Sequence, residues 1–206
     1  MRTTEVGSTG AGTITRAGLL GRGALGGAAL LVGGSVAGSA GAAVLPAQDL
    51  AYARLLVGAE LLAADFYSQA IGARASTGEA SRYLKRASLN EQEHYASVAG
   101  ILTGSGNTPA QPGDFDFTYP SGTFQSQASV AAFGAQLEVT ILGAYLGAIA
   151  GLQTDSFKAG LASIAACEAQ HASYLATLSG GKAFNLSFPP ALTIEHASDA
   201  FDAYSA

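Results

Sequence analysis

The sequence predicts an all-α protein: a bundle of four long helices, built as two helical hairpins, with a short fifth helix near the C-terminal end. Apolar residues recur at spacings of three and four along four long segments. Short turns separate the first segment from the second and the third from the fourth. A stretch with three prolines and no helical period, residues 105–127, separates the second from the third. The hairpins are therefore joined by one long connection.

The expected helices cover residues 47–74, 76–104, 128–153 and 155–181, and a short helix begins near residue 193. Asp49 is placed to cap the first helix. Ser76 or Thr77 is placed to cap the second, and Asp155 the fourth. An extended loop of about 20 residues can cover more than about 60 Å, whereas a helix of about 25 residues spans about 37 Å. The connection is thus long enough to cross the whole bundle.

The first 45 residues differ in kind from the rest. Arg2, Arg16 and Arg22 precede an uncharged Gly/Ala-rich run, and small residues near its end offer cleavage sites. Basic, then apolar, then small is the order of an export signal. Residues 15–21, TRAGLLG, resemble a twin-arginine export motif in which Ala17 replaces the second arginine. The run is also long enough to serve as a membrane anchor.

Three regions follow from these observations. Residues 1–45 are expected to be an export signal, twin-arginine-like but degenerate, or an N-terminal anchor. Residues 46–182 are expected to form the bundle, and residues 183–206 a C-terminal extension with the short helix. The expected location is the periplasm, the cell envelope or the extracellular space. Membrane contact is expected only through the N-terminal segment, if it is not cleaved.

Charge and cysteine content exclude several classes of protein. The net charge is -5 and no basic stripe lies beyond the first residues, which argues against nucleic acid as a partner. The single cysteine, Cys167, excludes an internal disulfide and Cys-x-x-Cys centres. It lies about 100° round the helix from Glu168, and we expect a small buried residue there. Glu93 and His196 are expected to face solvent.

Six side chains repeat between the two hairpins. Each hairpin carries a lone glutamate in its first helix and a Glu-x-x-His motif in its second: Glu60, Glu91 and His94, then Glu138, Glu168 and His171. Corresponding residues are 77 or 78 positions apart. Tyr67 and Tyr145 each follow the lone glutamate of their helix by seven residues, so each tyrosine shares a helix face with that glutamate. The repeat indicates an internal pseudo-duplication.

This pattern predicts a dinuclear metal site. A Glu and a His three residues apart project from one helix face, and all six side chains can meet at one depth in the bundle. Buried charges must be paired or coordinated, and four carboxylates balance two divalent ions. Mixed carboxylate and imidazole ligands suit iron or manganese. One Glu from each of two helices plus Glu-x-x-His from the other two is the pattern of dinuclear carboxylate bundles.

On these residues the sequence resembles the ferritin-like di-iron superfamily over residues 48–180. It looks most like exported bacterial ferritin-like domain proteins related to desiccation-related proteins. The resemblance implies a ferritin-like bundle with two iron ions, bridged by Glu91 and Glu168 and each bound by one histidine. It also implies dioxygen or peroxide as a substrate, in ferroxidase or peroxidase chemistry. Tyr67 and Tyr145 would lie beside the ligands.

Two alternatives stay open at this point. A manganese catalase uses a similar bundle with two manganese ions and disproportionates peroxide. A non-catalytic structural or desiccation-stress protein could keep the same site for stability. A homodimer is compatible with each of these.

Overall fold

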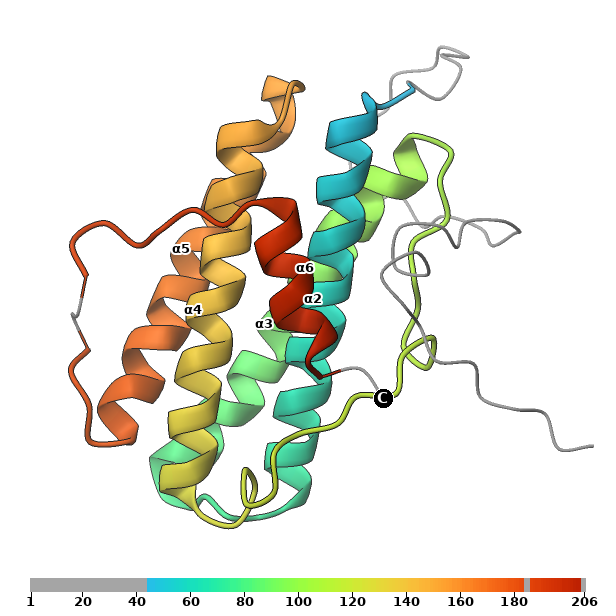
Figure 1. The fold of residues 1–206 in the computed structure, drawn as a ribbon. Coiled ribbons are helices and arrows are strands. Elements are labelled where there is room, and N and C mark those ends of the chain that lie inside the picture. Colours follow the sequence, from blue (N-terminus) through green and yellow to red (C-terminus); the bar gives the residue numbers. More distant parts are fainter. Residues whose placement is uncertain (1–43, 184–185, 205–206) are drawn as a thin grey trace, which may run out of the picture.

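Four long helices run alongside one another, and a short fifth helix lies against two of them (Figure 1). This computed structural model describes residues 44–183 and 186–204. The helices in this part are α2 (Ala47–Gly72), α3 (Gly78–Gly104), α4 (Gln127–Gly151), α5 (Asp155–Leu178) and α6 (Ile194–Asp202). The described residues contain no strand, so the predicted all-α fold class is confirmed. Most of the predicted export segment, residues 1–43, lies outside the described residues.

The helices pair as the two predicted hairpins. α2 packs against α3, and α4 against α5. Residues 105–126 run from the end of α3 back to the opposite end of the bundle, where α4 begins (Figure 1). The hairpins meet mainly through α2 and α4, whereas α3 and α5 touch only slightly.

Much of the apolar core comes from α2 and α4, and buried side chains of α3 and α5 complete it. Gly134 of α4 leaves room for the Phe66 ring, because a Cβ at Gly134 would lie 2.9 Å from ring atoms of Phe66. By length and composition, α4 is the one helix among the described residues that could cross a membrane. More than half of its most apolar stretch is buried in the bundle. Its apolar character is thus explained by its central position.

The C-terminal extension docks on α4 through two glycines. The Leu192 amide donates a hydrogen bond to the Gly143 carbonyl, 2.8 Å away. A Cβ at Gly147 would lie 1.8 Å from the Leu192 carbonyl oxygen, so only glycine permits this approach. From there α6 packs over α2 and α4 (Figure 1). The extension therefore covers the α2–α4 side of the bundle.

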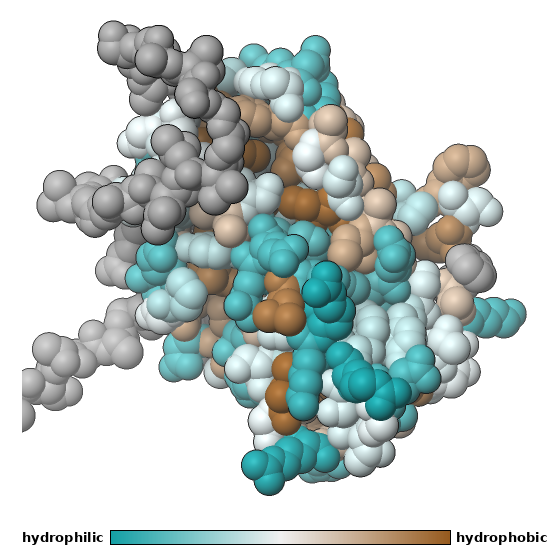
Figure 2. All heavy atoms as spheres, turned by 180° about the vertical axis from the view of Figure 1, so that it is seen from behind, coloured by the Kyte–Doolittle hydropathy of each residue, from teal (hydrophilic) through white to brown (hydrophobic). Residues whose placement is uncertain are grey.

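The opposite side of the bundle is formed by α3 and α5, away from the main contacts of α6. Figure 2 shows hydrophilic and apolar residues interspersed over the visible part of this side. Leu89 of α3 is 49% exposed. Apolar side chains here are scattered singly among polar ones, which is ordinary for a protein surface.

The capping predictions were wrong in their details. α2 begins after Pro46 without a side-chain cap bond, and the Asp49 side chain instead binds backbone amides of a distant turn. Its carboxylate accepts hydrogen bonds from the Gln153 and Thr154 amides, at 2.8 and 2.9 Å, in the turn before α5. Thr77 precedes α3 without a side-chain cap bond. Asp155, expected to cap α5, is its first residue.

Candidate metal centre

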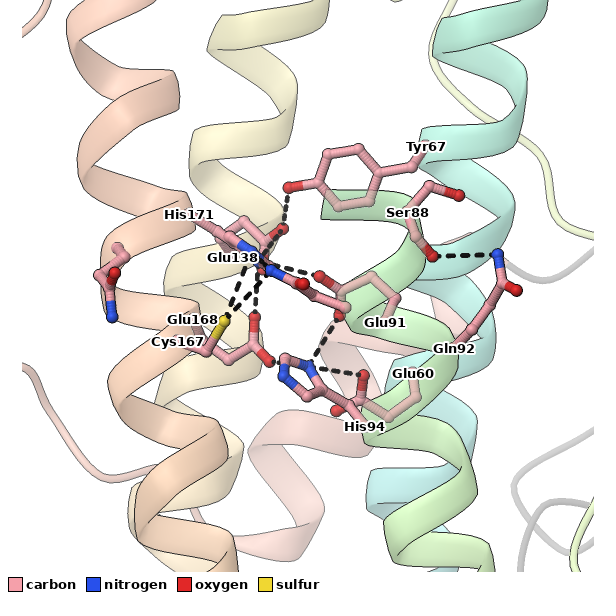
Figure 3. A network of polar contacts seen from close by, with 12 residues as sticks. Glu60, Tyr67, Ser88, Glu91, Gln92, His94, Glu138, Cys167, Glu168 and His171 are labelled. Atoms are coloured by element: carbon pink, nitrogen blue, oxygen red, sulfur yellow. Dashed lines mark hydrogen bonds and ion pairs between the residues drawn. The ribbon is translucent and has the colours of Figure 1, made fainter. Parts of the chain in front are cut away.

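The six predicted residues lie together in the middle of the bundle (Figure 3). Each lies on the helix that was predicted to carry it. α2 and α4 supply Glu60 and Glu138, while α3 and α5 supply the two Glu-x-x-His motifs. The four glutamates have no solvent exposure, and the two histidines are also buried. Glu93 and His196, which were expected to face solvent, are exposed.

One half of the cluster surrounds His94. Its Nδ1 atom lies 2.8 Å from Oε1 of Glu168, 3.3 Å from Oε2 of Glu91 and 3.7 Å from Oε2 of Glu60. Ligand atoms of these four residues all lie within 4.8 Å of one another. The group has the donor composition and compactness of a site for one cation.

The other half surrounds His171. Its Nδ1 atom lies 2.9 Å from Oε1 of Glu91, 3.2 Å from Oε2 of Glu168 and 3.6 Å from Oε1 of Glu138. Ligand atoms of His171 and these three glutamates also lie within 4.8 Å of one another. Glu91 and Glu168 are the members that the two groups share, and each directs one oxygen toward each histidine. The centre is thus two overlapping groups related by the internal repeat.

Several buried polar atoms of the centre have no hydrogen-bond partner: Oε2 of Glu60 and Glu138, Oε1 of Glu91, both carboxylate oxygens of Glu168, and Nδ1 of His171. Nδ1 of His171 and Oε1 of Glu91 are close, yet their geometry is not that of a hydrogen bond. Burying an unpartnered polar group costs roughly 2–7 kcal/mol. A concentration of such atoms is explained if they point at shared cations, so the donor set fits a pair of metal ions.

Each tyrosine reaches across to the glutamate of the other hairpin. The Tyr67 hydroxyl donates a hydrogen bond to Oε1 of Glu138, and the Tyr145 hydroxyl donates one to Oε1 of Glu60. Both rings are completely buried. Burial, followed by the charge of the neighbouring glutamate, raises the pKa of each hydroxyl well above its usual value. The hydroxyls therefore stay protonated and hold one oxygen of each glutamate, leaving Oε2 free.

Burial and mutual repulsion shift the pKa of the lone glutamates upward. The pKa of Glu60 is raised well above its usual value, first by burial and then by the charges of Glu168 and Glu91. The pKa of Glu138 is raised by burial and then by the same two charges. Without a cation, both carboxyl groups therefore favour the protonated form.

The pKa values of the two histidines and of Glu168 shift in the directions expected for an ion-pair network. Burial alone would lower the pKa of His94, but favourable interactions with Cys167, Glu168 and Glu91 outweigh it and raise the pKa to about 12. The pKa of His171 is raised for corresponding reasons. Burial would raise the pKa of Glu168, but the close approach of both histidines lowers it to about 2. The metal-free centre thus holds protons where the loaded centre would hold cations.

Two residues beside the centre were not predicted as part of it. Asn90 and Cys167 each precede the glutamate of a Glu-x-x-His motif. Nδ2 of Asn90 lies 3.1 Å from Nε2 of His171, and Sγ of Cys167 lies 3.6 Å from the same nitrogen. The expectation for Cys167 was wrong: it is only partly buried, and it contacts the centre. The 77-residue repeat contained this information, because Asn90 and Cys167 occupy equivalent positions in it.

Two comparisons with known proteins bear on the fold. A search of curated proteins gave no match. The family model for the ferritin-like domain matches residues 48–181, which is more than half of the chain. The match begins at the start of α2 and ends just after α5, so it spans all four long helices and all six residues of the centre. The chain belongs to the ferritin-like domain family.

Proposed function

We propose that the six clustered side chains bind two iron ions, one beside His94 and one beside His171. Glu91 and Glu168 would be shared, while Glu60 and Glu138 would each bind one ion. The observation that carries this proposal is the sharing itself, since Glu91 and Glu168 each turn one oxygen toward each imidazole. Four carboxylates balance the charge of two divalent ions, and carboxylate with imidazole is a donor set that iron accepts.

A bound iron pair would supply two electrons to dioxygen or peroxide, which is the chemistry of a ferroxidase or peroxidase. The protein's own residues prepare the site for this. Tyr67 and Tyr145 fix the lone glutamates through hydrogen bonds to one oxygen of each, and the second oxygen of each has no hydrogen-bond partner. The buried α2–α4 side keeps bulk water away. A small substrate would approach from the α3–α5 side, where His94 keeps 11% of its side chain exposed.

Metal analysis of the purified chain tests the proposal. Wild-type protein reconstituted anaerobically with ferrous iron should bind two ions per chain, and the Glu91→Ala/Glu168→Ala double variant should bind none. Glu93→Ala is the matched control, because Glu93 lies between two of the proposed ligands but faces solvent. It should keep both ions. Stoichiometric iron in the double variant would overturn the assignment, and a preference for manganese in competition would overturn the choice of iron.

Activity is a separate question with its own measurement. Ferrous protein mixed with dioxygen or peroxide should develop the absorbance of ferric centres faster than free ferrous iron does. The Glu91→Ala/Glu168→Ala variant should match the rate of free iron. Full occupancy with no change in absorbance would support a structural role instead.

We also infer that the protein is exported. The inference is supported by the order of the N-terminal residues, basic then apolar then small. Mass spectrometry of the protein from fractionated cells should find it outside the cytoplasm, with a new N-terminus near residue 45. Intact chains confined to the cytoplasm would contradict it.

A further inference from the structure

The outer nitrogen of His171 faces an amide and a thiol. In both histidines of the centre, Nδ1 is the atom directed at the carboxylates, so Nε2 points away from the proposed metal positions (Figure 3). At His171, Nε2 lies 3.1 Å from Nδ2 of Asn90 and 3.6 Å from Sγ of Cys167. Asn90 and Cys167 also contact each other, at 3.5 Å. These three groups form a small polar cluster between α3 and α5.

Metal binding determines which kind of partner this nitrogen needs. An imidazole that binds a cation through Nδ1 carries its proton on Nε2, and that N–H requires an acceptor. Asparagine is suited to this position because its amide has an oxygen acceptor on one side and an NH₂ donor on the other. Rotation of the amide by 180° presents one or the other. A thiol is only a weak acceptor, so Cys167 cannot replace the amide oxygen.

The two histidines differ in this respect. The position equivalent to Asn90 in the second hairpin is Cys167. The internal repeat therefore supplies an amide for His171 but no equivalent amide for His94. His171 is also the better enclosed, with 4% of its side chain exposed compared with 11% for His94. Tyr83 covers it further, with ring centroids 6.1 Å apart at an interplanar angle of 88°. The outer nitrogen of His171 is thus shielded from competing water.

We propose that Asn90 is the positioning residue of the His171 metal position: its amide oxygen accepts the Nε2–H hydrogen bond of the metal-bound imidazole. This inference rests on the proposed dinuclear centre. It makes the two positions unequal, with the His171 position the tighter. Loss of such an outer hydrogen bond typically weakens metal binding about 10–100-fold. The amide acts through His171 and does not itself touch the metal.

Anaerobic titration with cobalt(II), followed by visible absorption, tests the proposal. Wild-type protein should bind two ions. Asn90→Leu keeps a similar size but removes the acceptor, so one of the two binding steps should weaken about 10–100-fold while the other stays unchanged. Asn90→Asp restores an acceptor oxygen and should bind both ions at least as tightly as wild type. Gln92→Leu is the matched control, because this exposed amide contacts only the Ser88 carbonyl, at 3.1 Å.

A second readout distinguishes an outer hydrogen bond from a general structural effect. Proton NMR of the cobalt-loaded wild type should show a shifted, slowly exchanging N–H resonance from the His171 ring. The resonance should persist in Asn90→Asp and exchange rapidly in Asn90→Leu. If Asn90→Leu does not fold, the Asn90→Asp variant tests the proposal alone. The proposal requires that this variant keep the N–H resonance and bind both cobalt ions with wild-type affinity. Weaker binding of either ion would overturn it.

The possible failures are distinguishable. If Asn90→Leu binds both ions with wild-type affinity and keeps the slow N–H resonance, the role of Asn90 is wrong while the dinuclear centre stands. If wild-type protein fails to bind two cobalt ions, the centre itself is wrong and this inference falls with it.

Discussion

The Tyr67 hydroxyl donates a hydrogen bond to the Glu138 carboxylate, 71 positions along the chain and on the other hairpin. Tyr145 does the same for Glu60, so the two bonds link α2 and α4 in both directions. Both pairs are completely buried. The contact couples the packing of the two hairpins to the orientation of two proposed metal ligands.

Removing these hydroxyls should weaken metal binding. Tyr67→Phe keeps the ring but frees Oε1 of Glu138, so we expect metal affinity to fall about 10-fold, and Tyr145→Phe should act alike through Glu60. Isothermal titration with cobalt(II) measures this. Tyr174→Phe, which alters a partly buried ring stacked on Tyr83 at 3.8 Å, is the control and should bind normally. Unchanged affinity in the Tyr67→Phe/Tyr145→Phe double variant would show that the bonds do not orient the ligands.

Metal binding should release protons. The pKa values of Glu60 and Glu138 are raised, chiefly by burial. Burial would lower those of His94 and His171, but interactions with Cys167, Glu168 and Glu91 outweigh it and raise them. The histidines hold protons near neutral pH that cations must displace, so loading should release at least two protons, or about one per ion, and the raised pKa of each lone glutamate adds to this release as pH falls. Calorimetric titration in buffers of different ionisation enthalpy counts them. Release of fewer than one proton per ion would contradict this charge distribution.

The metal-free protein should lose stability from mildly acidic to alkaline pH. The folded-state pKa of His94 is about 12, whereas the unfolded value is about 6.5, so the folded chain alone keeps that proton above pH 6.5. Stability therefore falls as pH rises through this range. The raised pKa of Glu60 acts in the same direction above its unfolded value. Glu168, with a pKa of about 2, loses its contribution as pH falls from about 4.5 to about 2.

We consequently expect the Tm of the chelator-treated protein to be highest near about pH 5 and to decrease toward pH 8. Scanning calorimetry at constant ionic strength checks this. The metal-loaded protein is the control, and its gain in Tm over the metal-free form should grow with pH because protons compete with the metal. A Tm of the metal-free protein that rises between pH 5 and pH 8 would contradict the pKa directions.

Asp49 should matter for stability although it lies outside the metal centre. Its buried carboxylate accepts the Gln153 and Thr154 amides. Asp49→Ala leaves both amides without their acceptor, at a cost of about 1–3 kcal/mol each, so the free energy of unfolding should fall by about 2–6 kcal/mol. Urea denaturation of the metal-free protein measures this. Asp155→Ala is the control, since Asp155 is largely exposed and pairs only with Lys158. A similar loss in both variants would assign the effect to helix charge instead.

The bundle and the grouping of six side chains were predictable because both follow from periodicity. Helical spacing defines the four helices, and the repeat of 77 or 78 residues places Glu60 beside Glu91 and Glu138 beside Glu168 at one depth. The tyrosine bonds were only half predictable. A spacing of seven places Tyr67 on the face of Glu60, but which glutamate its hydroxyl reaches depends on how far α2 and α4 are rotated toward each other.

The missed residues depend on contacts between elements. The position of Asp49 in the sequence predicts a cap of its own helix. In the structure α2 packs against the α4–α5 turn, and the Asp49 carboxylate accepts hydrogen bonds from amides more than 100 positions away. Cys167 lies about 100° from Glu168 round α5, which suggested a separate environment. His171 is four residues on, about one turn, and its ring extends back to the thiol. A comparison of every position across the repeat, rather than of carboxylates and imidazoles alone, would have identified Asn90 and Cys167.

Anomalous diffraction from crystals loaded with ferrous iron tests the central claim most directly. Two peaks should appear at the iron edge, one beside Nδ1 of His94 and one beside Nδ1 of His171, with Glu91 and Glu168 contacting both. Crystals of the Glu91→Ala/Glu168→Ala variant should show neither. A single peak, or peaks away from these six side chains, would contradict a shared dinuclear centre.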